Sequence, residues 1–193
     1  MLFRVIARLF GSEWKLKQRC MNTRQPGLKY MLIKIYGLYQ YENGSSIAWD
    51  AQFGGIPCFP HGMKSIFISG AAKFGRNCVI FQQVTIGSNM TVGSRGLGAP
   101  VIGDNCYIGA GAKIVGAVKV GHNVRIGANA VVHTDVPDNC VVLVGEQRVL
   151  QRSELQDNRF YSYRGRWMFY EDGRWHPVND DAALAQLMKD AAE

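Results

Sequence analysis

The sequence predicts a mainly β protein built as a triangular parallel solenoid. Two observations lead to this class: a six-residue repeat and an excess of glycine. The chain has 193 residues, 47% of them hydrophobic, and its 22 glycines are about 11% of it, against ~7% in ordinary proteins. This length and composition fit one domain with appendages at its ends and exclude wholesale disorder.

The repeat begins at Ile68 and divides the chain every six residues. The blocks read ISGAAK, FGRNCV, IFQQVT and IGSNMT, then, after VGSRGLGAPV, they read IGDNCY, IGAGAK, IVGAVK, VGHNVR, IGANAV and VHTDVP. Position one is a large apolar residue, position two is most often Gly, and position five is small or slender. Helices repeat at 3.6 residues and simple strands at 2, so a period of six predicts three short strands per coil. One coil cannot bury its own faces, so the coils must stack.

Three details of the repeat are also predicted. Positions one and five should point into a narrow interior, and Gly at position two should supply turn conformations that other residues resist. An insertion of four residues should bulge out around residues 96–99. A partial repeat begins earlier, at Ile47. The solenoid is therefore assigned to residues 47–149, after an N-terminal segment 1–46 and before a C-terminal extension 150–193.

Cysteine and charge limit the functional classes. The five cysteines are odd in number, widely spaced and without a CxxC pair, which favours buried packing in a reducing cytoplasm. Cys78 and Cys106 fall on position five. The net charge is +7, and most of the surplus precedes the repeat. A solvated helix face and an anionic membrane surface could both explain this surplus, whereas no nucleic-acid motif accompanies it. With no signal peptide or spanning segment expected, the predicted location is cytoplasmic, with peripheral contact on the inner membrane face as an open alternative.

The tandem Ile-Gly-x-x-Ala-x pattern resembles the hexapeptide-repeat acyltransferases. Within that family, the segment GAPVIGDNCYIGAGAKIVGAVKVGHNVRIGANAVVHTDVP is most similar to the serine acetyltransferases and their sugar-modifying relatives. The resemblance implies a left-handed parallel β-helix. It also implies acetyl transfer from acetyl-coenzyme A to a hydroxyl, in a homotrimer with active sites between adjacent subunits.

His61 is the candidate general base. Transfer from a thioester to an alcohol needs a base with a pKa near neutral, and His61 lies in PCFPHGMKSIFIS, off the inward positions of the repeat. Its His-Gly turn matches the catalytic turn of the resembled family. The aspartate that orients the base in that family matches Ser46 here, so Asp50 is the nearest substitute. The family's second active-site histidine is replaced by Ala99.

These departures favour a hydroxyl of a sugar or polysaccharide precursor over free serine. Serine O-acetyltransferase and a catalytically silent trimeric scaffold remain alternatives. Metal-dependent carbonic anhydrases share this solenoid, but His61, His122 and His133 lack the close pairing their metal requires, so no metal is expected. No cysteine has an obvious base partner, which favours direct transfer over an acyl-enzyme.

The remaining site residues follow from this chemistry. The oxyanion could be stabilised by backbone N–H groups, Gln82 or Gln83. The pantetheine arm of the coenzyme is expected along small residues of the late coils, where the resemblance also puts coenzyme contacts: Gly109, Ala110, Gly127 and Ala128. Its phosphates need cations, for which the candidates are Lys113, Lys119, Arg125 and Arg148.

The two ends have separate predictions. MLFRVIARLF and LKYMLIKIYGLYQY have helix-compatible spacing, so they either cap the first coil or dock on a membrane. Beyond the repeat, NRFYSYRGRWMFYEDGRWHPV predicts a β-hairpin and DDAALAQLMKDAAE a short helix. The aromatic residues Trp167, Tyr170 and Trp175 could stack on sugar rings or seal the last coil.

Overall fold

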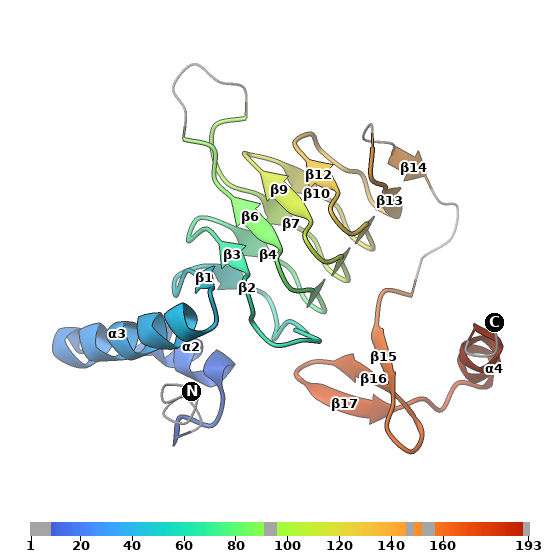
Figure 1. The fold of residues 1–193 in the computed structure, drawn as a ribbon, viewed down its shortest axis with the longest axis horizontal. Helices are drawn as coiled ribbons and strands as arrows, with labels where there is room; N and C mark the ends of the chain where they lie inside the picture. Colours follow the sequence, from blue (N-terminus) through green and yellow to red (C-terminus); the bar gives the residue numbers. More distant parts are fainter. Residues whose placement is uncertain (1–8, 91–95, 146–148, 152–156, 191–193) are drawn as a thin grey trace.

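A computed structural model describes residues 9–90, 96–145, 149–151 and 157–190, and its centre is a triangular solenoid of three sheets (Figure 1). The first sheet contains β1 (Ser46–Ile47), β3 (Phe67–Ile68), β6 (Thr85–Gly87), β9 (Lys113–Val115) and β12 (Val131–Val132). The second contains β2 (Gln52–Phe53), β4 (Lys73–Phe74), β7 (Val101–Ile102) and β10 (Lys119–Val120). The third contains β5 (Val79–Ile80), β8 (Tyr107–Ile108), β11 (Arg125–Ile126), β13 (Cys140–Val142) and β14 (Val149–Gln151).

The chain visits the three sheets in turn, and equivalent residues pair in register. In the first sheet, Ile68 pairs with Ile86, Ile86 with Ile114, and Ile114 with Val132, all in parallel. Among the described strands of these three sheets, β14 alone runs antiparallel to its neighbour, and there the repeat ends. Three hexapeptides per coil are therefore confirmed.

The interior is filled as the repeat predicts. The described first-position residues from Ile68 to Val132 are at most 5% exposed. The described fifth-position residues are buried as well, Cys78 and Cys106 among them, with the exception of Met90. All five cysteines are buried free thiols. The core is thus a stack of aliphatic layers closed by slender side chains.

The insertion is longer than predicted. Ile86 lies on the first sheet, but Ile102 lies on the second, in register with Phe74 and Val120. The step between adjacent sheets therefore takes sixteen residues instead of six, so ten residues are inserted, not four. The inserted segment leaves the coil where the backbones of Asn89 and Gly98 pair at 2.8 and 2.9 Å. Met90 lies in this segment, which explains its exposure.

The role of glycine at position two also differs from the prediction. The left-handed backbone falls two residues later, for example at Asn105 (φ 56°) and Asn123 (φ 55°). At Gly103, an added Cβ would lie 2.6 Å from the carbonyl oxygen of Gly121 in the next coil. Position two therefore needs glycine because neighbouring coils approach closely there, and position four takes asparagine because Asn tolerates a positive φ.

The N-terminal segment packs two helices, α2 (Glu13–Asn22) and α3 (Pro26–Glu42), against the first coil. Gln40 Oε1 accepts a hydrogen bond from the backbone N–H of Ile47 at 3.0 Å, so it satisfies an edge donor of β1. Lys17 of α2 donates to the carbonyl oxygens of Ala51 (2.7 Å) and Trp49 (3.1 Å). The cap predicted from the second apolar segment is therefore present, whereas most of the first segment, residues 1–8, lies outside the described chain.

The C-terminal extension forms one strand more than predicted. An antiparallel sheet of β15 (Phe160–Tyr163), β16 (Trp167–Glu171) and β17 (Arg174–Pro177) precedes α4 (Asp181–Asp190). This sheet returns toward the first coil and does not cover the last one (Figure 1). Among the described residues, no helix is both long enough and apolar enough to cross a bilayer.

Candidate active site

Most of the predicted site residues lie on one edge of the prism, here named the site edge. It is the column of turns by which the chain passes from the third sheet to the first: residues 59–66, 81–84, 109–112 and 127–130. Backbone hydrogen bonds join successive turns, from Gln83 N–H to Lys64 O (3.3 Å), from Gly111 N–H to Gln82 O (3.0 Å), and from Asn129 N–H to Ala110 O (2.8 Å).

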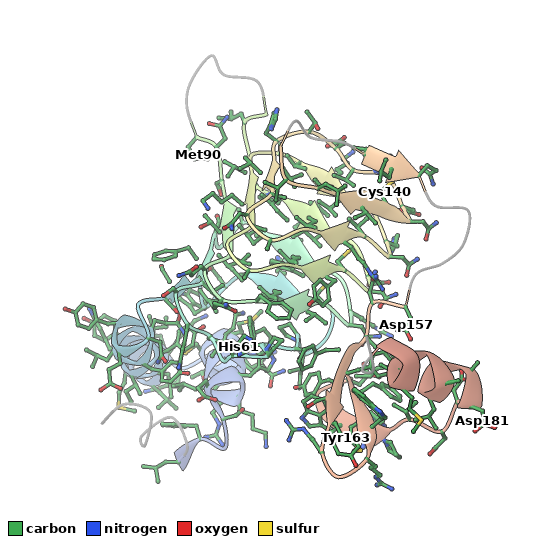
Figure 2. The ribbon with its side chains drawn as sticks, turned by 45° about the vertical axis from the view of Figure 1, so that its right-hand side comes forward. His61, Met90, Cys140, Asp157, Tyr163 and Asp181 are labelled. Carbon is green, nitrogen blue, oxygen red and sulfur yellow. The ribbon has the colours of Figure 1, made fainter. Side chains whose placement is uncertain are left out.

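His61 projects from the first of these turns. Figure 2 shows it between the N-terminal helices and the C-terminal sheet. Its side chain is exposed, and its ring meets the ring of Phe81 edge-on, with the centroids 5.8 Å apart. No hydrogen bond to its imidazole occurs within the described part of the chain. Both ring nitrogens are therefore open to a substrate hydroxyl or to a residue from another subunit.

The two candidate amides occupy the next turn of the edge. Gln83 is exposed and has a left-handed backbone (φ 62°). Gln82 is half-buried, and its Oε1 atom is enclosed without a hydrogen-bond partner among the described residues. An unpaired buried amide oxygen costs free energy, so this atom has unused capacity to accept a hydrogen bond.

The candidate coenzyme segment continues up the same edge. Gly109 is buried, and an added Cβ would lie 2.7 Å from the backbone nitrogen of Ala128, so coil packing alone explains this glycine. Ala110 and Gly127 are half-buried and Ala128 is exposed. Lys113 starts the strand that follows, and its Nζ donates to the carbonyl oxygen of Gly111 at 2.9 Å. The edge thus offers a small-residue surface with an ammonium group beside it.

Other candidates lie elsewhere. Asp50 belongs to the edge between the first and second sheets, beside Gly70, and is not on the edge that carries His61. Lys119 is on the second sheet, also away from the site edge.

The two arginine candidates differ in what the structure shows of them. Arg125, on the third sheet, donates hydrogen bonds to Asn158 Oδ1 (2.7 Å) and to the carbonyl oxygen of Asp157 (2.5 Å). Arg148 lies outside the described residues.

The structure adds neighbours of His61 that sequence reasoning missed. Phe81 stands at position two, where glycine is usual, so its departure from the repeat was the available signal. The centroid of its ring lies 5.1 Å from that of Tyr107 and 6.1 Å from that of Phe160 in β15.

A second contact attaches the C-terminal sheet to the solenoid. Asn158, just before β15, is 1% exposed, and its side-chain amide donates to the carbonyl oxygen of Asn105 at 2.6 Å. These contacts together hold the C-terminal sheet beside Phe81 and the turn that contains His61.

Charge on the site edge is one-sided. Its turns contain His61 and Lys64 but no Asp or Glu, which suits an anionic coenzyme. Cys58 directly precedes the first of these turns, and burial raises its pKa to about 12, as it raises that of Cys20 in α2 to about 11. No cysteine thiolate is therefore available here as a nucleophile near neutral pH.

This arrangement resembles that of the hexapeptide-repeat acyltransferases, and comparison with known proteins supports the resemblance. Residues 99–134 match the family described as bacterial transferase hexapeptide (six repeats). The resemblance expected from the repeat is confirmed, as is the left-handed β-helix.

Several similar proteins are serine acetyltransferases. The one from Synechococcus elongatus is 43% identical over 113 residues, covering 58% of this chain and 45% of the relative. The one from Staphylococcus xylosus is 38% identical over 137 residues, covering 70% and 62%. The crystal structure of the Neisseria gonorrhoeae enzyme is 28% identical, with a TM-score of 0.59, over 74% of this chain and 52% of that one. The chain thus spans roughly half the length of such relatives.

Proposed function

We propose that this protein is an O-acetyltransferase that uses acetyl-coenzyme A. The observation that carries the proposal is the site edge, on which an exposed histidine free of described hydrogen bonds precedes two glutamines and a small-residue surface. The donor is supported by the curated relatives, which are named serine acetyltransferases. A similar structure, a serine acetyltransferase in complex with CoA, is 23% identical with a TM-score of 0.61 and supports the fold alone.

The reaction assigned to this edge is direct transfer in a ternary complex. His61 removes the proton from the acceptor hydroxyl as its oxygen attacks the thioester carbonyl. A C–O bond forms, the C–S bond breaks, and the sulfur of the leaving coenzyme takes up a proton. In this proposal, backbone N–H groups or the side-chain amides of Gln82 and Gln83 stabilise the oxyanion. Lys64 on the site edge and Lys113 beside it are the cations proposed to bind the phosphates.

Serine is the acceptor that the comparisons favour over a sugar. The curated relatives are named serine acetyltransferases, and a structure of the Neisseria gonorrhoeae enzyme in complex with serine is 27% identical, with a TM-score of 0.57, over 72% of this chain and 53% of that one. The sequence-based preference for a glycan precursor over serine therefore has less support than its alternative.

A sugar hydroxyl remains the second candidate because of one cavity. A space of about 330 Å³ lies beside Gly62 and Lys64, between the N-terminal helices and the C-terminal sheet. Its walls include four aromatic rings, those of Trp14, Tyr39, Phe59 and Tyr170. Aromatic walls with a few polar groups suit a ring-shaped polar ligand better than free serine.

The test is thiol release from acetyl-coenzyme A in the presence of serine, hexoses, amino sugars and oligosaccharides. Turnover on serine alone establishes the first acceptor, and turnover on a carbohydrate establishes the second. In a third outcome, the protein binds the coenzyme yet releases thiol no faster than hydrolysis with every acceptor. That result would refute the proposed enzymatic activity and support a catalytically silent scaffold.

We also infer a homotrimer, in which an adjacent subunit supplies the groups that orient His61. Ser46 stands where the resembled family has its aspartate, and no described carboxylate contacts the imidazole. Light scattering should then give three times the 21.5 kDa of one chain. A monomeric mass with full turnover would refute the shared site.

A further inference from the structure

Helix α3 has two faces of different character. Its inner face packs on α2 and on the first coil, where Leu32, Tyr36 and Tyr39 are buried. Gln40 on this side binds the edge strand β1. The capping role of α3 therefore uses only about half of its surface.

The outer face of α3 is unusually apolar for a surface that meets water. It consists of Tyr30, Met31, Lys34, Leu38 and Tyr41, which recur at the three- and four-residue spacing of one helix side. The four uncharged side chains are 64%, 49%, 45% and 83% exposed, respectively. Single exposed hydrophobic residues are ordinary, but a continuous stripe of four marks a binding surface.

The charge on and just before this helix is mostly positive. Arg24, Lys29 and Lys34 face a single acid, Glu42, the last residue of the helix. The Nζ atom of Lys34 lies 5.2 Å from the centre of the Tyr30 ring. Exposed tyrosines and aliphatic residues flanked by lysines are the combination of helices that lie in a membrane interface.

We propose that the outer face of α3 binds the surface of a membrane containing anionic phospholipids. The helix would lie in the interface, with its rings and aliphatic side chains among the acyl chains and its cations at the headgroups. Lys34 in the middle of this face favours an anionic surface over a second copy of a chain whose net charge is +7.

The proposal does not depend on the reaction, but it has a consequence for it. The backbone N–H of Ser65 donates to the carbonyl oxygen of Asn43, which follows α3, at 3.0 Å. The turn containing His61 is thereby tied to the end of the docked helix. A bound membrane would hold the site edge at a fixed distance from the lipid surface.

The experiment is co-sedimentation of the full chain with vesicles. Vesicles of phosphatidylcholine with phosphatidylglycerol should bind the protein, and vesicles of phosphatidylcholine alone should bind it at least tenfold less. Replacing Tyr30, Met31, Leu38 and Tyr41 together by Ser should weaken binding at least tenfold, and Lys34→Glu severalfold. The matched control is Tyr163→Ser with Met188→Ser, because these side chains are 65% and 66% exposed outside α3 and should not alter binding.

Three results would overturn the proposal. The first is wild-type protein that stays in the supernatant with anionic vesicles. The second is a four-serine variant with an unchanged melting temperature that binds them like the wild type. The third is a lower mass of that variant in light scattering without lipid, which would show that a second copy covers this face.

Discussion

Two edges of the same prism contain histidines in similar turns, yet they make opposite use of them. On the edge between the second and third sheets, Arg76 N–H donates to Asp104 Oδ1 (2.7 Å), Asp104 N–H to His122 Nδ1 (3.0 Å), and His122 N–H to Asp138 Oδ1 (2.8 Å). His122 is thus one rung of a ladder that ties coils together. On the site edge, His61 makes no such bond among the described residues. A histidine occupied by the backbone stabilises the fold, and one left open can do chemistry.

The largest effect should separate the two histidines. His61→Ala removes the proposed base, so turnover should fall by about 10²–10⁴-fold, the usual contribution of general-base catalysis. His122→Asp keeps an acceptor for the Asp104 N–H and should leave turnover unchanged. Thiol release from acetyl-coenzyme A measures both. Equal turnover of His61→Ala and the wild type would remove His61 as the base.

The next largest effect is on stability, at the edge between the second and third sheets, where successive coils approach closely. Gly103→Ala would put a Cβ 2.6 Å from a carbonyl oxygen of the next coil, so the backbone must shift. Overpacking of this kind costs about 1–3 kcal/mol, which should appear as a lower melting temperature.

The matched control for this substitution is Gly37→Ala in α3. No atom lies within 4 Å of the added Cβ there, and alanine favours a helix by about 0.5–1 kcal/mol. If Gly103→Ala is as stable as the control, neighbouring coils can accommodate the added methyl group without loss of stability.

A third prediction concerns pH and the lysine that fastens α2 to the first coil. Burial lowers the pKa of Lys17 from 10.5 to about 8. The folded protein therefore binds this proton more weakly than the unfolded chain. The destabilisation is complete below pH 8 and disappears as the pH rises to about 10.5.

Lys17→Met removes this dependence. The free energy of unfolding of the wild type, relative to the variant, should therefore rise by about 2 kcal/mol between pH 8 and pH 10.5. Urea unfolding of both proteins at these two pH values measures the change. A constant difference would mean that Lys17 is solvated in the folded protein.

The smallest effect on stability should come from the hydrogen bonds that join successive coils on the edge between the second and third sheets. His122→Leu leaves the Asp104 N–H without its acceptor, at a cost of about 1 kcal/mol because the side chain is half-exposed. His122→Asp should restore most of that stability. Melting curves of the two variants test this. Identical melting temperatures of His122→Leu and His122→Asp would show that water replaces the hydrogen bond to the Asp104 N–H.

Much of the solenoid could be predicted because its period is local. A six-residue repeat fixes which side chains point inward, and Ile68, Ile86 and Ile114 do stack in register. The insertion was misjudged because IGSNMT keeps the pattern of the repeat while Met90 has already left the coil. The role of Gly103 was misassigned because a single strand does not show how near the next coil lies.

The candidate site, like the fold, has features that the sequence predicts and features that only the structure shows. The sequence by itself determined that His61 falls in an irregular turn and that Gly109 and Gly127, three hexapeptides apart, share one edge. Gln82 lies on the same edge only because the insertion contains ten residues and not the four that the sequence predicted. Only the tertiary structure decided that Asp50 lies on another edge. It also decided that the C-terminal sheet returns to the site edge, where the ring centroid of Phe160 lies 6.1 Å from that of Phe81. The physical reason is range: a repeat encodes contacts between coils, whereas the return of a terminal sheet depends on packing between segments that no local pattern relates.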